Sequence, residues 1–163
     1  MNIDSIRIVE ADLADPLHQR EIVRLIDHYA QDPVGGGRAL PDLVRARMID
    51  GLRAHWATIV LLAFEGDRAV GVAVCFMGFS TFAARELINI HDLAVEDGHR
   101  GRGIGRALLE AVEARAHAMN CYKITLEVLA TNDRARKLYA SFGFAGADAP
   151  ASPGVTLFCT KWL

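Results

Sequence analysis

Residues 99–110, HRGRGIGRALLE, place three glycines and three arginines in front of a leucine-rich segment typical of a helix. Backbone N–H groups at a helix start have no partners within the helix, and the helix dipole adds partial positive charge there. Glycines leave these groups accessible to an anion, because they have no Cβ atom. The stretch therefore predicts a phosphate-binding turn, to which Arg100, Arg102 and Arg106 can add charge-assisted hydrogen bonds.

The spacing of the glycines excludes two common phosphate motifs. The P-loop pattern GxxxxGK[ST] fails because no Lys-Ser or Lys-Thr pair follows, and the dinucleotide pattern GxGxxG fails because Arg106 occupies the place of the last glycine. The pattern [Q/R]-x-x-G-x-[G/A] does fit, with Arg100, Gly103 and Gly105 at its defined positions. Taken alone, so short a pattern is more typical of a tight strand-to-helix turn with solvated arginines.

Hydrophobic periodicity predicts the elements that position this turn. A helix from Pro16 to about Gln31 is capped by Asp15, and Pro41 opens a second helix after a loop over 32–40. The expected order β-α-α-β-β-β-α-β-α-β(β) is that of an α/β fold of the α+β type, with a central mixed sheet flanked by helices. The other expected elements are strands over 5–10, 57–65, 69–77, 86–95, 122–130 and 155–163, and helices over 103–119 and 131–142.

The same periodicity predicts how these elements pack. Strands 86–95 and 122–130 enclose a helix, so we expect them to be parallel neighbours. In the second helix we expect Leu43, Met48 and Leu52 to be buried. Strand alternation places Asn89, His91 and Leu93 on one face of the strand 86–95, and Ile90, Asp92 and Ala94 on the other. The apolar stripe of the third helix is expected to contain Ile104, Ala107, Leu108, Ala111, Ala118 and Met119.

Composition narrows the possible classes of function. The chain has 163 residues, 52% of them hydrophobic, which fits one domain over 1–163. The formal net charge of −2 gives no basic excess for nucleic acid, and no apolar run reaches the roughly 18 to 20 residues of a membrane span. Cys75, Cys121 and Cys159 form no CxxC pair, so we expect buried, reduced thiols. With an acidic, strand-like N-terminus, we expect a cytoplasmic protein without nucleic-acid or membrane partners.

Three motifs occur in a fixed order along the second half of the chain. They are LAV at the end of the strand 86–95, the R-x-x-G-x-G turn, and N-x-x-A-x-x-L-Y-x-x-x-G-F over 132–144. Together they resemble the GCN5-related N-acetyltransferase (GNAT) superfamily, specifically over about residues 87–144 and more loosely in layout elsewhere. The resemblance implies a GNAT-like acyl-CoA N-acyltransferase fold and an enzyme that moves an acetyl group from acetyl-CoA to a primary amine, with no metal.

The resemblance also implies a set of cofactor-binding residues. The backbone of the turn would bind the pyrophosphate, and the strand end would hydrogen-bond to pantetheine. Asn132 would contact the cofactor arm, although its position is also typical of a helix N-cap. Tyr139 would act as the general acid toward the coenzyme A thiolate, although its spacing is also typical of a core aromatic. The full set is Leu93, Ala94, Val95, Arg100, Gly101, Arg102, Gly103, Ile104, Gly105, Arg106, Asn132, Ala135 and Tyr139.

The residues for the acceptor amine are less clearly marked. Many members of the superfamily carry a glutamate base before LAV, where this chain has NIHD. His91 is the first candidate base, because the ordinary pKa of histidine lies near neutrality, and a hydrogen-bonded core histidine is the alternative. Asp92 is the second candidate and could instead anchor an ammonium group, and Glu127 is the third. Tyr29, Asp32 and the glycines at 35–37 are expected to line the acceptor's entrance, with Asp32 suited to a cationic amine.

The acceptor itself stays open at this stage. A small-molecule amine is the first hypothesis, because the mostly short loops give little sign of a peptide groove. The alternatives are a protein N-terminus or lysine, and a non-catalytic domain that binds acyl-CoA as a sensor. The strand 155–163 either closes the sheet or pairs across a homodimer.

Overall fold

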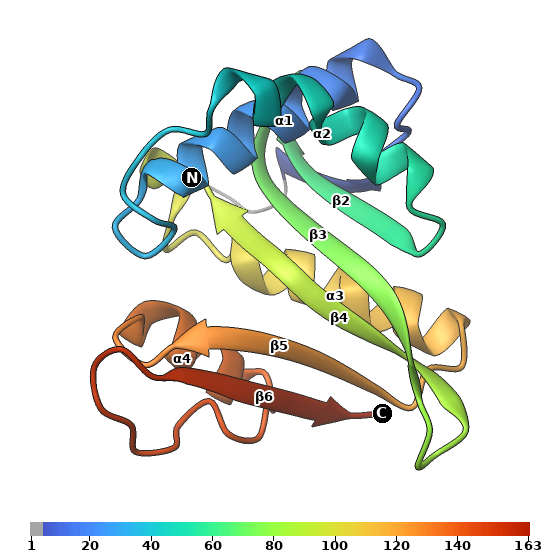
Figure 1. Ribbon diagram of the computed structural model, residues 1–163, viewed down its shortest axis with the longest axis vertical. Coiled ribbons are helices and arrows are strands. Elements are labelled where there is room, and N and C mark those ends of the chain that lie inside the picture. Colours follow the sequence, from blue (N-terminus) through green and yellow to red (C-terminus); the bar gives the residue numbers. More distant parts are fainter. Residues whose placement is uncertain (1–4) are drawn as a thin grey trace.

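The computed structural model describes residues 5–163, which form a six-stranded mixed sheet in the order β1-β2-β3-β4-β5-β6 (Figure 1). Within this part of the chain β4 and β5 run parallel, and the other neighbouring strands are antiparallel. The strands are β1 (Ile6–Glu10), β2 (Thr58–Glu65), β3 (Arg68–Ser80), β4 (Arg85–Val95), β5 (Lys123–Leu129) and β6 (Thr156–Trp162). The helices are α1 (Pro16–Gln31), α2 (Asp42–Ala54), the short 3-10 helix η2 (Asp97–His99), α3 (Ile104–Ala118) and α4 (Asp133–Ser141).

This arrangement confirms the predicted fold class, the order of elements and the parallel pairing of β4 with β5. The optional last strand of the prediction is reduced to an isolated bridge between Ala145 and Thr160.

The local signals for helix ends are also confirmed. Asp15 caps α1 by accepting a hydrogen bond from the Leu17 amide at 2.7 Å, and Asn132 caps α4 in the same way through the Ala135 amide at 3.2 Å.

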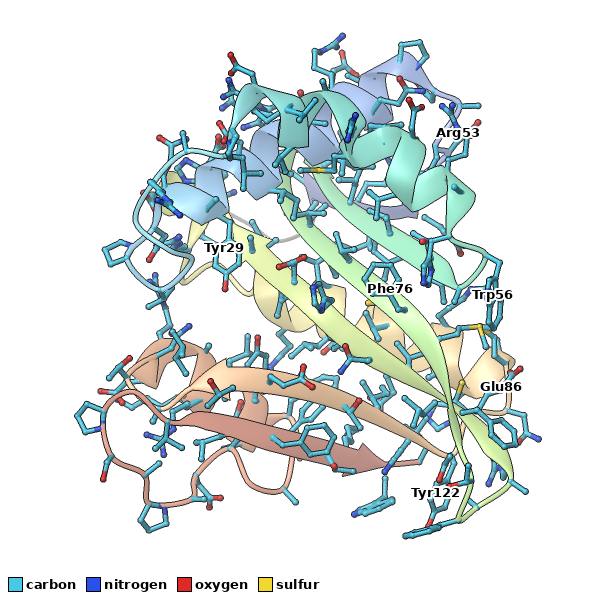
Figure 2. All side chains as sticks on the ribbon, in the orientation of Figure 1. Tyr29, Arg53, Trp56, Phe76, Glu86 and Tyr122 are labelled. Carbon is cyan, nitrogen blue, oxygen red and sulfur yellow. The ribbon has the colours of Figure 1, made fainter. Side chains whose placement is uncertain are left out.

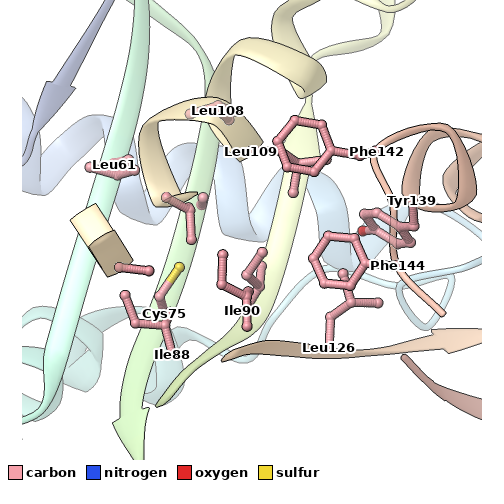
Figure 3. Packing of buried hydrophobic residues seen from close by; sticks show 14 of the residues in the cluster. Leu61, Cys75, Ile88, Ile90, Leu108, Leu109, Leu126, Tyr139, Phe142 and Phe144 are labelled. Atoms are coloured by element: carbon pink, nitrogen blue, oxygen red, sulfur yellow. The ribbon is translucent and has the colours of Figure 1, made fainter. Parts of the chain in front are cut away.

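Helices cover both faces of the sheet (Figure 1). On one face, Ile22 of α1 packs with Leu62 of β2 in a core that also contacts α2. On the other face, Leu108 of α3 packs in a larger core with side chains of β2 to β6. Figure 3 shows Tyr139 and Phe144 in this second core, beside the leucines of α3. The end of the sheet where α3 begins therefore has a rigid layer on each side.

Two predictions about helix burial were wrong, one about which face of α3 is buried and one about how deeply α2 is buried. The buried face of α3 is rotated relative to the predicted one. It includes leucine and valine side chains, because these bury more apolar area than alanine. On α2 no residue is fully buried, and Leu43 is 61% exposed. The buried residues of α3 are Ile104, Leu108, Leu109, Val112 and Ala116.

The predicted alternation along β4 is interrupted. Val74 of β3 lies opposite Asp92, but the next residue, Cys75, lies opposite Ile90, so His91 has no partner on β3. Such a bulge inserts one residue and reverses the faces beyond it. Ile90 and Leu93 consequently contact the same core, where alternation had placed them on opposite faces.

Cys75, Cys121 and Cys159 are buried and unpaired, as predicted. Over residues 5–163, no helix is both long and apolar enough to cross a membrane. In the same part of the chain, no three His, Cys, Asp or Glu side chains gather in a way that would hold a metal ion.

Candidate active site

A slot opens between β4 and β5 at the end of the sheet next to α3. Pairing of the two strands ends at Ile90 and Leu126, whereas β4 continues against β3 to Val95 and β5 continues against β6 to Leu129. A cavity of about 330 Å³, the donor cavity, occupies this slot and extends to the glycine-rich turn. It is lined by all the predicted cofactor residues except Arg102, and also by Tyr29, Asp32, Val34, His99, Arg134, Leu138 and Ser141.

The glycine-rich turn presents free backbone amides to the donor cavity. Gly103, the N-cap of α3, has φ +84° and offers no side chain to the first turn of the helix. Gly101 has φ +78°. Both values lie in the left-handed region that side-chain-bearing residues rarely adopt. A Cβ atom on Gly105 would stand 3.1 Å from Leu138 Cδ2. The turn is therefore shaped as an anion cradle at a helix N-terminus.

The arginines of the turn are largely engaged by the protein itself. Arg100 donates from Nε to the Val95 carbonyl at 2.8 Å and from a terminal nitrogen to Asp32 at 2.9 Å. Arg102 lies 2.5 Å from Glu65, which keeps its side chain out of the cavity. The Arg102 guanidinium lowers the pKa of the Glu65 carboxyl. These side chains hold the turn in place, so what the turn offers to a phosphate is mainly its backbone.

Asp32 has a structural task besides the predicted one. Its carboxylate accepts from the Val34 amide at 3.0 Å, which is the main reason for its lowered pKa, and it also binds Arg100. The predicted role as an ammonium anchor stays a prediction, because the carboxylate oxygens can accept further hydrogen bonds. In the structure Asp32 connects the end of α1 to the glycine-rich turn.

Tyr139 lies where the donor cavity meets a smaller acceptor cavity of about 130 Å³. Its side chain packs edge-on against Phe144 with ring centroids 5.8 Å apart, so it is a core aromatic as well. Its hydroxyl makes no hydrogen bond to any residue of the described chain. Burial is the main cause that raises the pKa of the Tyr139 phenol, and nearby Tyr29 adds to it. A neutral hydroxyl is thus available as a donor at the junction.

The acceptor cavity contains two of the three candidate bases, His91 and Glu127. His91 is exposed and contacts the Phe76 ring edge-on at 5.5 Å, so the alternative of a hydrogen-bonded core histidine is wrong. The Glu127 carboxylate accepts a hydrogen bond from Asn89 Nδ2 at 3.3 Å. The other lining residues are Tyr29, Val34, Ile90, Leu93, Val128, Leu129, Asn132, Ala135, Tyr139 and Thr156.

Asp92 lines neither the donor nor the acceptor cavity. It is half-buried, and burial raises the pKa of its carboxyl while the neighbouring His91 acts in the opposite direction. Because the bulge shifts the register, Asp92 lies opposite Val74, whose side chain belongs to the core under α1. Its charge nevertheless helps to raise the pKa of both Tyr29 and Tyr139, so Asp92 lies close to the junction of the cavities and stays a candidate for the base or an ammonium anchor.

The loop after α1 closes over the acceptor cavity through a close backbone contact. A Cβ atom on Gly35 would lie 2.0 Å from the Tyr29 carbonyl oxygen, so only glycine fits there. Tyr29 and Val34 line both cavities. The sequence analysis did not single out Val34; its position directly before the glycines was the available signal.

Comparison with known proteins agrees with this geometry. The sequence model of the acetyltransferase (GNAT) family matches residues 22–144. N-alpha-acetyltransferase 40 of Saccharomyces cerevisiae is 39% identical over 79 residues, which are 42% of this chain and 28% of that protein. Streptothricin acetyltransferase of Streptomyces lavendulae is 32% identical over 96 residues, which are 59% of this chain and 48% of that protein. The chain thus spans less than half the length of these two relatives.

The fold has close counterparts among solved structures. A chain in the crystal structure of the NatC complex bound to Gag peptide and CoA matches with a TM-score of 0.73 at 22% identity. The match covers 100% of this chain and 99% of that chain. At this identity the likeness concerns the fold.

Proposed function

The chain belongs to the acetyltransferase (GNAT) family, and from that premise we propose that it is an acetyl-CoA-dependent N-acetyltransferase acting on a primary amine of a small molecule. One observation carries the proposal. Tyr139, with a free neutral hydroxyl, lies at the junction of a cavity built for a phosphorylated thioester and a cavity that contains proton acceptors. An acyl transfer between a thioester and an amine needs this combination.

The donor cavity suits coenzyme A in shape and charge. The amides around Gly103 would hold the pyrophosphate, and the unpaired edge of β4 over 93–95 would take hydrogen bonds from pantetheine as a neighbouring strand does. When bound, acetyl-CoA supplies the acetyl group as an activated thioester. An amide of the same edge could polarise the thioester carbonyl, in the manner of an oxyanion hole.

The chain's own residues would move two protons. A base in the acceptor cavity takes a proton from the acceptor's ammonium group, and the free amine then attacks the carbonyl carbon. The new C–N bond forms as the C–S bond breaks, and the nitrogen then loses its second proton to solvent to give the neutral amide. Tyr139 donates its hydroxyl proton toward the departing sulfur, and solvent restores the proton balance afterwards. Proton transfer of this kind contributes on the order of 10²–10⁴-fold to a rate.

Glu127 is the base that we propose, with His91 beside it as the alternative. A catalytic base is commonly oriented by a third group, and Glu127 has such a group in the Asn89 amide. His91 contacts the Phe76 ring and interacts electrostatically with Asp92, but no hydrogen bond orients it within residues 5–163. Glu127→Gln should therefore abolish the acidic limb of the pH–rate profile, whereas His91→Ala should keep it. The reverse result would assign the base to His91.

The defining experiment follows release of free thiol from acetyl-CoA with a panel of amines and N-terminal peptides. Tyr139→Phe should lower turnover by about 10²–10⁴-fold and leave acetyl-CoA affinity within about twofold. Tyr122→Phe, outside both cavities, is the matched control. Because the pKa of Tyr139 is raised, we expect no alkaline loss of activity from this group below about pH 10.

Two outcomes would replace the proposal. Turnover confined to peptides would favour a protein N-terminus as acceptor, the second candidate, which the similarity to N-alpha-acetyltransferase 40 supports. Binding of acetyl-CoA without thiol release for any acceptor would make the protein a sensor of acyl-CoA.

A further inference from the structure

An apolar groove of about 490 Å³ lies between α2 and β3, outside the two cavities described above. We call it the α2 groove; it is lined by Leu43, Val44, Arg47, Met48, Gly51, Leu52, His55 and Phe76. Leu43 is 61% exposed and Val44 45% exposed, although helical periodicity places Leu43 on the buried face. The fold leaves this apolar surface without a protein partner among residues 5–163.

The α2 groove lies next to the acceptor cavity, with the rings of Phe76 and His91 between them. Phe76 lines the groove, and its ring contacts His91, which lines the cavity. In the strand register Phe76 also lies opposite Asn89, the residue that orients Glu127. Figure 2 shows Phe76 beside β3, on the face of the sheet that α1 and α2 partly cover. A molecule that reaches Glu127 with one end can therefore lie along the groove with the other.

The charges around the α2 groove disfavour a cationic occupant. Its lining includes Arg47 and His55 but no carboxylate. The acidic side chains next to it on α2 are already paired, Asp42 with Arg45 and Asp50 with Arg53 at 3.5 Å. A second ammonium group would find no counter-ion there, whereas an alkyl or aromatic chain would bury apolar surface.

We propose that the α2 groove holds the chain of the acceptor, so that the preferred acceptor is an amine with one positive charge and an extended apolar chain. The inference rests on the proposed function, because it takes the acceptor's nitrogen to lie beside Glu127. The acceptor cavity, at about 130 Å³, has room for little beyond the reacting groups, so a longer chain must leave it. The contact between Phe76 and His91 marks where such a chain would pass from the cavity into the groove.

A series of acceptors tests the proposal directly. Turnover is measured with n-butylamine, n-hexylamine, n-octylamine and 1,8-diaminooctane. The last two have the same carbon chain, and only the diamine carries a second amino group. Each buried methylene contributes up to about threefold, so kcat/KM should rise by about tenfold or more from butyl to octyl. The diamine should fall about tenfold below n-octylamine, since its second charge meets apolar surface. Equal values along the series, or a preference for the diamine, would overturn the proposal and leave acetyl transfer itself intact.

Variants of exposed residues test whether the chain-length preference arises in the α2 groove. In the double variant Leu43→Ser, Val44→Ser both side chains are exposed, so the fold is retained while the groove loses its apolar wall. It should reduce the octyl-to-butyl ratio by about threefold to tenfold and leave n-butylamine turnover unchanged. Phe82→Ser, fully exposed and outside the groove, is the matched control. An octyl-to-butyl ratio that the double variant leaves unchanged would contradict the placement of the chain.

A binding measurement separates this inference from the proposed function. N-octylacetamide is the neutral product of the reaction, and calorimetry measures its affinity without any turnover. We expect binding that is at least about tenfold tighter than that of N-butylacetamide and is weakened in the double variant. Equal affinities for the two amides would overturn the inference even if the enzyme acetylates amines. Octyl-selective binding without turnover would retain the groove and refute the acetyltransferase.

Discussion

The donor side and the acceptor side of the slot are built by opposite means. On the donor side the turn has tight backbone angles and is tied by ion pairs, with Arg100 bound to Asp32 and Arg102 to Glu65. On the acceptor side the side chains that could do chemistry, His91 and Glu127, are exposed, and the adjacent α2 groove is open. The contrast indicates that the donor side is held in one arrangement, whereas the acceptor side leaves its side chains free to meet a ligand.

The largest effect is expected from Gly103→Val on the donor side. A β-branched residue is strained at φ +84°, and its side chain would cover the amides of the turn. Acetyl-CoA affinity measured by calorimetry should fall by about 100-fold or more, because the anion site is lost. The acceptor side should be unaffected, so binding of N-octylacetamide should stay unchanged.

Gly98→Ala is the matched control for this change. Gly98 lies in η2, just before the turn, has no positive φ, and a Cβ atom there would meet nothing within 4 Å. It should keep wild-type affinity for acetyl-CoA. Wild-type affinity in Gly103→Val would show that the turn does not bind the cofactor through its backbone, and the distinction between the two sides would fail.

The donor side was predictable because its chemistry is local in sequence. The glycines, the helix start and the cap at Asn132 all follow from rules that span a few residues, and the βαβ unit fixes where they meet. Burial of α3 was predicted less well, since Leu109 and Val112 rotate its packed face. The partners of Arg100 and Arg102 were not predictable, because Asp32 and Glu65 are remote along the chain.

The acceptor side could not be predicted from the sequence, because it depends on how β3 and β4 pair. The bulge opposite Val74 and Cys75 is a property of two strands together, and strand alternation along β4 alone cannot reveal it. It leaves His91 exposed beside Glu127 and places Asp92 opposite Val74, against the predicted alternation. Exposure of Leu43 was missed for a similar reason, since helical periodicity gives a face but not whether a partner covers it.

The second prediction concerns the connection between the two sides. Asp32→Asn keeps an oxygen for the Val34 amide but removes the charge that pairs with Arg100. Arg100 retains Asp97 at 2.6 Å and the Val95 carbonyl, so the turn should stay in place while the loop over 32–40 loosens. We expect the acceptor KM to rise by about threefold to tenfold, with a smaller change in acetyl-CoA affinity.

Asp97→Asn is the control for Asp32→Asn, because it removes another charge that contacts Arg100 without touching the loop. It should leave the acceptor KM within about twofold. If Asp32→Asn weakened acetyl-CoA binding more than acceptor binding, Asp32 would belong to the donor side alone.

The third prediction uses carboxyl groups whose pKa values shift in opposite directions. Arg102 lowers the pKa of Glu65, so this carboxylate stabilises the fold above its unfolded pKa and loses the contribution as pH falls below about 4.5. Burial raises the pKa of Asp92, so its ionised form costs stability as pH rises through the folded value. Melting curves at pH 7 should place Glu65→Gln a few degrees below the wild type and Asp92→Asn above it.

Both melting differences should shrink as the pH is lowered and the wild-type carboxyl groups take up protons, at a lower pH for Glu65 than for Asp92. A Glu65→Gln variant as stable as the wild type at pH 7 would mean that the ion pair does not anchor the turn. A destabilised Asp92→Asn would mean that the Asp92 carboxylate has a favourable partner in the folded protein.

The smallest effect is expected from Gly51→Ala in α2. Glycine within a helix costs about 0.5–1 kcal/mol relative to alanine, and a Cβ atom at this position would meet nothing within 4 Å. Denaturant unfolding should therefore show a gain of about that size, with n-butylamine turnover unchanged. Because Gly51 lines the α2 groove, the added methyl group should also lower n-octylamine turnover by a small factor. A gain in stability together with that loss would show that α2 gives up helix stability to keep the groove open, whereas a gain without it would place the acceptor's chain elsewhere.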